Sequence, residues 1–397
     1  MGNSTSKLVR VIFMIHCLKV YQVVFLANHI GLFGCILMKI GVITVSNSSK
    51  GLHRDAELIG WALDKSPTTE VEIIHLKTIE TDKIEIGSVS SNQPTSFSIV
   101  TEGSVKEWID TIDVLFVLEV VNINILNYAV QKTKVVFVPN LEWAVSKENN
   151  IQSTSFWIET VRNYCSRGMV VIAKSMMIQK SLISKKITSE LVRWSIPDPI
   201  LIKRMPKFDE KKTTVMMNAG QGGWRGRRGV DIFIEAIRLV PKKNSFKFIL
   251  KTIKPWSEYD LGTLPNNLTL IEGFMSRDDL RKLTSSADLI IYPSRFEGFG
   301  LSMLEAMHQG IPVMCTDGWP MNEIQTIKNN LLLIDSSKET PLRLAISFEP
   351  NSKSIVENLV GLQNLNIRQF FPIELVTNGL LERQKGFVDA IHAIADL

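Results

Sequence analysis

Short apolar runs alternate with amphipathic segments through the first half of the chain. The continuous apolar runs predict strands at Lys39–Val45, Val71–Leu76, Asp113–Leu118, Lys134–Val138 and Met169–Ala173. Apolar positions spaced three and four residues apart predict helices at Asp55–Leu63, Ile123–Lys132 and Phe156–Tyr164. Apolar strands that alternate with helices are typical of a parallel sheet covered on both faces. The pattern therefore predicts an α/β domain.

This alternation stops at Ile196–Lys212, a polar segment with three prolines, and then starts again. The second series predicts strands at Thr213–Asn218, Phe246–Leu250, Leu268–Glu272, Asp288–Tyr292 and Pro312–Cys315. It predicts helices at Val230–Leu239, Arg277–Ser285 and Leu301–Gln309. Two such units predict two Rossmann-like doubly wound domains that face each other across a central cleft. Ligands of such sheets bind at the carboxyl ends of the strands, so the cleft is the expected site.

The same pattern divides the chain into four parts. We place the first domain at residues 38–199 and the second at residues 200–350. Residues 351–397 form a helical tail, interrupted by a proline and a glycine, that is able to return to the first domain. Each domain is long enough to bury a core of its own.

The N-terminal extension, residues 1–37, leaves three interpretations open. It precedes a methionine, Met38, that begins a predicted strand and can be the real start of the protein. Val20–Leu37 is mostly apolar and can be a weak membrane anchor, although polar residues interrupt it. The first six residues also fit an acylation pattern.

Composition and charge argue against some classes of function. The 397 residues are 45% hydrophobic and 21% charged, with a net charge of +5, which suits a globular protein that binds phosphates or lies near an anionic membrane. No long run of lysines and arginines is present to follow a nucleic acid, so we expect no nucleic-acid partner. The four cysteines form no Cys-x-x-Cys pair and have no histidine at metal-ligand spacing. We therefore expect no metal site and a cytoplasmic protein, and leave peripheral attachment to the inner face of the membrane open.

The segment Tyr292–Val313 combines residues that suit a sugar nucleotide. It leaves a predicted strand, turns through Gly298 and Gly300, and enters a predicted helix. The glycines allow a ligand to approach the backbone, and the free amides at the start of the helix form an anion site. Glu297 in the loop can accept hydrogen bonds from sugar hydroxyls, and Glu305 can hold a ribose with both carboxylate oxygens.

This segment resembles the Glu-x7-Glu signature of the family-4 retaining glycosyltransferases, which have the GT-B fold. The resemblance continues through Cys315–Glu323; it covers Thr213–Asp335 well and is only fold-level in the first domain. It implies that Glu297 is catalytic and contacts the transferred sugar, and that Glu305 binds the ribose. It also implies that the donor phosphate faces the backbone amides of Gly298, Phe299, Gly300 and Leu301.

A second glycine-rich stretch, Asn218–Asp231, directly follows the first strand of the second domain. Its Arg225, Arg227 and Arg228 offer planar forks for phosphate oxygens, and a leaving diphosphate needs its developing charge neutralised. The stretch resembles the family's Gly-Arg-Leu-x-x-x-Lys-Gly with Arg228 in place of the lysine, but Gly223 stands where the arginine is usual. We expect Arg228 to be catalytic and take Arg225 as the candidate for the missing arginine, although the sequence leaves that choice open.

Several positions of the first domain are candidates for ligand binding. The polar loop expected at residues 46–51 makes Gly51 and the neighbouring Lys50 candidates for donor binding, as GT-B enzymes place small residues near the donor there. Asn140, Glu142 and Trp143 follow one strand and suit an acceptor, because aromatic faces stack on sugars and amides hydrogen-bond to hydroxyls. Glu119 ends a neighbouring strand and is also expected to open towards the cleft; structural roles remain open for all of these residues.

The resemblance implies transfer of a sugar with retention of anomeric configuration. A diphosphate is a good leaving group, so the reaction needs no protonating carboxylic acid. The absence of an Asp-x-Asp motif favours a metal-independent reaction without a cofactor. The expected partners are a nucleotide-diphosphate sugar as donor and a glycan or lipid-linked acceptor. A nucleotide-sugar epimerase of the same fold and a non-catalytic sugar-nucleotide-binding protein remain alternatives.

Overall fold

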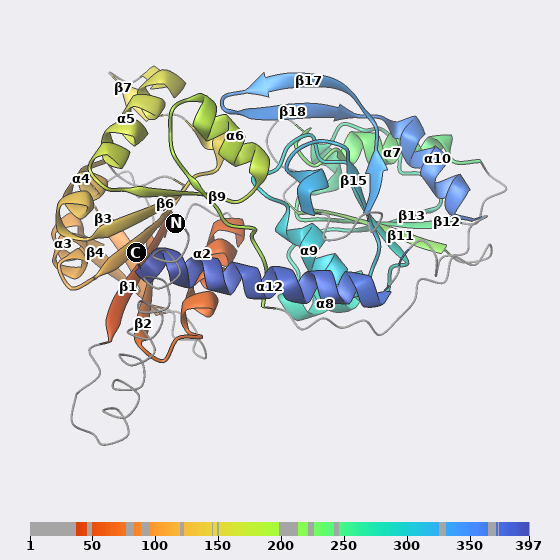
Figure 1. Ribbon diagram of the computed structural model, residues 1–397. Helices are drawn as coiled ribbons and strands as arrows, with labels where there is room; N and C mark the ends of the chain where they lie inside the picture. The colour runs from red at the N-terminus through yellow and green to blue at the C-terminus, as the bar shows by residue number, and fades with distance from the viewer. Residues whose placement is uncertain are drawn as a thin grey trace, which may run out of the picture.

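The computed structural model shows two α/β domains side by side (Figure 1). It describes residues 37–45, 50–76, 83–88, 96–119, 123–144, 146–148, 151–197, 213–220, 226–241, 246–324, 331–363, 371 and 373–396. The predictions for residues 1–36 and for Arg225 lie outside these ranges. Among the described segments, every helix is too short or too polar to pass through a bilayer.

A parallel six-stranded sheet with the order β10-β9-β6-β5-β1-β2 forms the first domain. Its strands are β1 (Met38–Val45), β2 (Thr69–Leu76), β5 (Val114–Leu118), β6 (Lys134–Val138), β9 (Val170–Ala173) and β10 (Glu190–Leu191). Its helices are α2 (Lys50–Leu63), α3 (Glu102–Ile109), α4 (Ile123–Lys132), α5 (Thr154–Ser166) and α6 (Met176–Ser184). Every residue of β5 is buried, as expected for a central strand covered on both faces.

The second domain repeats this architecture with the order β13-β12-β11-β14-β15-β16, again parallel throughout. Its strands are β11 (Thr213–Gly220), β12 (Phe246–Thr252), β13 (Leu268–Ile271), β14 (Leu289–Tyr292), β15 (Val313–Thr316) and β16 (Leu331–Ile334). Its helices are α7 (Val230–Leu239), α8 (Arg277–Ser285), α9 (Leu301–His308) and α10 (Ser352–Leu362). The predicted fold of two Rossmann-like domains is therefore confirmed.

Several short elements were not predicted from the sequence. Two of them are the antiparallel hairpins β3–β4 (Lys83–Ser88 and Ser96–Thr101) and β7–β8 (Ser146–Glu148 and Ile151–Ser153). The 3₁₀ helices are η1 (Leu141–Trp143), η3 (Trp256–Glu258) and η4 (Met321–Ile324). The loop expected at residues 46–51 is shorter than predicted, because α2 begins at Lys50 and places Gly51 in its first turn.

A third hairpin, β17–β18 (Ser336–Leu342 and Ala345–Pro350), extends from the second domain over the first (Figure 1). Arg343 at its tip donates a hydrogen bond to the backbone carbonyl of Glu142 at 2.5 Å. The Ser181 hydroxyl of α6 donates to the carbonyl of Leu344 at 2.8 Å. These contacts tie the two domains together on one side of the cleft.

On the other side, the C-terminal helix α12 (Ile373–Asp396) runs along both domains (Figure 1). Its Phe387 is fully buried, stacks on Trp61 of α2 with ring centroids 6.3 Å apart, and meets Trp194 edge-on at 5.0 Å. His392 Nε2 lies 2.7 Å from the carbonyl of Ala62 in the same helix α2. The break expected at Gly379 is wrong, since α12 continues through it; tertiary packing of one face outweighs the roughly 1 kcal/mol that glycine costs inside a helix.

Candidate functional site between the domains

The loop between β14 and α9 is held in place by two left-handed glycines. Gly300 caps α9 with φ = 101°, a conformation that glycine adopts without strain. Gly229, at the start of α7, has φ = 66°, and a Cβ there would come within 1.9 Å of the carbonyl oxygen of Pro293. The arginine-rich loop before α7 therefore packs directly against the loop that carries Glu297.

Glu297 lies buried at the centre of this loop, with 5% of its surface exposed. Its carboxylate accepts hydrogen bonds from Arg227 at 2.6 Å, from the Ser294 hydroxyl at 2.9 Å, and from Arg228. Burial acts to raise the pKa of Glu297, but the two guanidinium groups overcome it and hold this pKa below its usual range. Glu297 is therefore a buried anion at neutral pH.

The residues that follow Glu297 take different positions around the start of α9. Phe299 is buried, and the guanidinium of Arg383 from α12 lies 5.4 Å from its ring centroid. Leu301 is partly buried against the core. The Glu305 side chain is 32% exposed and lies 4.0 Å from Arg54 Nε of α2. Glu305 is thus a partly exposed residue at the boundary of the two domains.

Two predicted acceptor residues of the first domain lie directly against this loop. A Cβ at Gly298 would come within 2.9 Å of Asn140 Oδ1 and 3.0 Å of Glu142 Oε1, so only glycine permits this approach. Glu142 is 3% exposed, and its Oε1 lies 4.0 Å from the Arg227 guanidinium. Arg227 therefore stands between a carboxylate of each domain.

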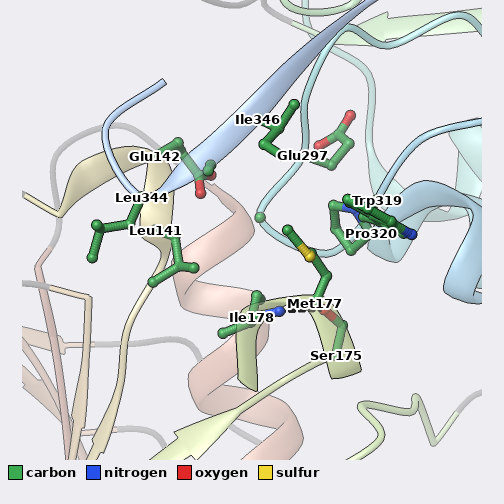
Figure 2. A pocket seen from close by; sticks show the side chains of 12 residues that line it. Leu141, Glu142, Ser175, Met177, Ile178, Glu297, Trp319, Pro320, Leu344 and Ile346 are labelled. Atoms are coloured by element: carbon green, nitrogen blue, oxygen red, sulfur yellow. Dashed lines mark hydrogen bonds between the residues drawn. The ribbon is translucent and has the colours of Figure 1, made fainter. Parts of the chain in front are cut away.

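An open pocket lies where these residues meet. Glu142 and Glu297 stand on different sides of it, and Met177 and Ser175 line the part below (Figure 2). Trp319, which follows β15 and is 38% exposed, lines the pocket beside Glu297. Its walls thus come from both domains and combine carboxylates with apolar and aromatic side chains, as is typical of ligand sites.

Much of the predicted site is brought together by the fold, although the role of each residue stays a prediction. Glu297, Gly298, Arg228, Asn140 and Glu142 converge at the cleft. Trp143 instead packs against the tip of the third hairpin, where the Arg343 guanidinium lies 5.3 Å from the centroid of the Trp143 ring.

Sequence reasoning missed several contacts. Arg227 forms an ion pair with Glu297, as Arg228 does, and the sequence did not predict this pairing; Arg225 lies outside the described residues. The buried ion pair between Lys174 and Asp55, at 3.1 Å, could not be predicted from any local sequence pattern.

Within the described ranges, no group of three His, Cys, Asp or Glu side chains is arranged to hold a metal ion.

Comparisons with known proteins find a family match within the second domain. Residues 213–347 match the family model described as glycosyl transferases group 1. The chain is 29% identical over 124 residues to the lipopolysaccharide glucosyltransferase WaaG of Escherichia coli K12, covering 30% of this chain and 33% of the relative. It is also 29% identical over 111 residues to the O-antigen chain mannosyltransferase B of Escherichia coli, covering 26% of this chain and 29% of the relative. The chain thus spans about a third of the length of the curated relatives it matches.

Solved structures match over both domains. A glycosyltransferase from Rickettsia africae has a TM-score of 0.61 at 15% identity, covering 90% of this chain and 98% of its own. A sucrose-phosphate synthase from Thermosynechococcus elongatus has a TM-score of 0.57 at 16% identity, covering 90% of this chain and 96% of its own. At this identity the likeness shows the fold alone: the chain has the two-domain fold shared by these glycosyltransferases, and its second domain carries the group 1 sequence pattern.

Proposed function

We propose that the protein is a glycosyltransferase that moves a hexose-type sugar from a nucleotide-diphosphate donor to a glycan or lipid-linked acceptor. The observation that carries the proposal is the buried Glu297 carboxylate, held by Arg227 and Arg228 at a pocket between two Rossmann-like domains. A sugar bears many hydroxyls and a diphosphate bears negative charge. A carboxylate flanked by two guanidinium groups offers a partner for each.

In this proposal the second domain binds the donor. The amides at the start of α9, from Gly298 to Leu301, face the diphosphate, and Glu305 holds the ribose hydroxyls. Arg228 and Arg227 shift part of their hydrogen bonding from Glu297 to the diphosphate when the donor is bound. Glu297 is then free to accept hydrogen bonds from the sugar.

The first domain binds the acceptor from the other side of the pocket. Asn140 and Glu142 are already in contact distance of the Gly298 loop, so an acceptor that touches them also meets the sugar held there. The relatives named above act on lipopolysaccharide and on the O-antigen chain, which supports a glycan or lipid-linked acceptor here. Holding both substrates together is the main catalytic contribution we expect from the cleft.

The proposal includes independence from a divalent metal and from any cofactor. Two guanidinium groups beside the sugar site can neutralise the charge that develops on the departing diphosphate. It also includes retention of anomeric configuration, which rests on the Glu-x7-Glu resemblance alone.

The test is nucleotide release from a panel of UDP-, GDP- and TDP-sugars, with and without sugar acceptors and with and without chelator. We expect release that needs an acceptor and survives the chelator. Glu297→Gln and Arg228→Ala should each lower the transfer rate by about a hundredfold or more, the usual cost of removing one group that stabilises developing charge. Glu235→Gln, an exposed glutamate on α7, is the matched control and should keep the wild-type rate.

Each alternative gives a different result. An epimerase converts the donor sugar with no acceptor present, and a non-catalytic protein binds nucleotide without releasing it. Wild-type transfer in both Glu297→Gln and Arg228→Ala would remove the proposed roles of these residues.

A further inference from the structure

Glu119 is a charged residue held in an unusual backbone conformation at the cleft side of the first sheet. It directly follows β5, whose five residues are all buried, and its φ is 65°. A residue other than glycine rarely adopts this left-handed backbone conformation, which costs about 1–3 kcal/mol. Its backbone amide donates to the carbonyl of Val138 at 3.0 Å, so the surrounding structure fixes the conformation. Strain of this kind is concentrated at ligand sites.

The strained backbone presents the Glu119 carboxylate to Asn140. Asn140 Nδ2 donates to Glu119 Oε2 at 3.4 Å, while its Oδ1 lies on the side of Gly298. The side chain of Asn140 therefore lies between Glu119 and the loop that carries Glu297. Within the described part of the chain, Asn140 Oδ1 is buried without a hydrogen-bond partner, and a buried acceptor without a partner is costly.

The charged groups that face Glu119 come from three elements of its own domain and from the facing domain. Glu142 belongs to η1, Lys174 follows β9, and Asp55 lies on α2; Arg227 approaches from the second domain. Lys174 is already paired with Asp55 at 3.1 Å. Burial, and next the repulsion by Glu142, raise the pKa of Glu119 to about 7.

These contacts define what can bind here. The Glu119 carboxylate and Asn140 Oδ1 are both hydrogen-bond acceptors, so their ligand must be a hydrogen-bond donor. Asn140 lies on the first-domain side of the Gly298 loop, directly against the loop that carries Glu297. A hydroxyl at this place lies next to the sugar that Glu297 is proposed to hold.

We propose that Glu119 is an acceptor-binding residue whose carboxylate, together with Asn140 Oδ1, accepts hydrogen bonds from hydroxyls of the incoming acceptor. The inference rests on the proposed transferase function and assigns this subsite within it. A hydrogen bond to a charged acceptor is about twice as strong as one to a neutral acceptor. The acceptor should therefore bind more tightly as pH rises through neutrality and Glu119 ionises.

The experiment compares Glu119→Gln with wild type in transfer from the active nucleotide-sugar to octyl glycosides of glucose, galactose, mannose and N-acetylglucosamine. The variant keeps the size of the side chain and removes its charge. We expect the KM for the octyl glycoside at pH 8 to rise about tenfold, which corresponds to the loss of one charge-assisted hydrogen bond. The KM for the donor and the slow hydrolysis of donor without acceptor should stay within about twofold.

Two controls separate binding from a structural effect. Glu107→Gln, exposed on α3, should leave both KM values unchanged. Glu119→Asp retains the charge and should restore part of the pH dependence that Glu119→Gln loses between pH 6 and pH 8. A wild-type acceptor KM in Glu119→Gln, or a donor KM raised by the same factor, would overturn the inference. No nucleotide release by the wild-type protein would instead refute the transferase function itself.

Discussion

Replacing Glu119 by glutamine should make the protein more stable at high pH and change little at low pH. The Glu119 carboxyl is largely buried beside Glu142, and its pKa is raised from 4.5 to about 7. Glutamine has nearly the same shape but never ionises. The variant therefore removes the cost of a buried charge without removing a well-packed group.

The magnitude follows from the two pKa values. In the unfolded chain the group loses its proton near pH 4.5, and in the folded protein near pH 7. Because the folded-state pKa is the higher one, stability is greatest below pH 4.5 and falls as pH rises to 7, by about 3 kcal/mol in total. Between pH 5 and pH 8 the difference between variant and wild type should grow by about 2.5 kcal/mol.

Thermal unfolding at pH 5, 6, 7 and 8 measures this difference. For a domain of this size, 2.5 kcal/mol corresponds to a rise in Tm of about 5–10 °C. Glu107→Gln is the control, since an exposed carboxyl should give the same Tm difference at every pH. A Tm difference for Glu119→Gln that stays constant from pH 5 to pH 8 would show that the carboxyl titrates normally, and the argument from burial would be wrong.

Two further substitutions test the packing around the cleft. Gly229→Ala should destabilise the second domain by more than about 2 kcal/mol, because the new Cβ would meet the carbonyl of Pro293 at 1.9 Å in a left-handed backbone. Gly168→Ala, also left-handed but with no atom near the new Cβ, carries only the backbone cost, and equal losses in chemical denaturation would contradict the steric argument. Glu323→Ala removes a carboxylate that accepts hydrogen bonds from the first two backbone amides of α6, across the domain boundary, at 2.7 and 2.9 Å. Together these hydrogen bonds contribute about 2 kcal/mol. The domains should then open, which small-angle scattering detects as a larger radius of gyration; an unchanged radius would mean that other contacts hold the cleft closed.

Local pattern was enough to predict the two sheets and the position of the central motif. Apolar runs such as Lys134–Val138 coincide with β6, and Leu301–Gln309 differs from α9 by one residue. The reason is that strand and helix periodicity are expressed within a few residues, wherever the segment lies in the fold. The turn through Gly298 and Gly300 likewise predicts Glu297 in a loop that follows a strand, and the residue lies in the loop between β14 and α9.

The predictions were less accurate for the ends and the continuity of helices and for the hairpins. Helix α2 begins at Lys50, five residues before the predicted start at Asp55. Helix α12 runs through Gly379, because packing of α12 on α2 outweighs the local signal for a break. The hairpin β17–β18 has no strong alternation of its own, and it is held by contacts of Arg343 and Leu344 with the first domain.

Local sequence pattern is sufficient to show which chemical groups this protein can present: a carboxylate loop, an arginine-rich turn, and polar residues at strand ends. Packing within the second domain brings Arg227 and Arg228 to the same carboxylate of Glu297, and the packing of the two domains places Asn140 and Glu142 against Gly298 of the other domain. The fold also places Glu119 beside Glu142 in a largely buried position, which raises the pKa of Glu119. Secondary structure follows from interactions between near neighbours in the chain, whereas a contact between two domains depends on how their whole surfaces fit, and no local pattern encodes that fit.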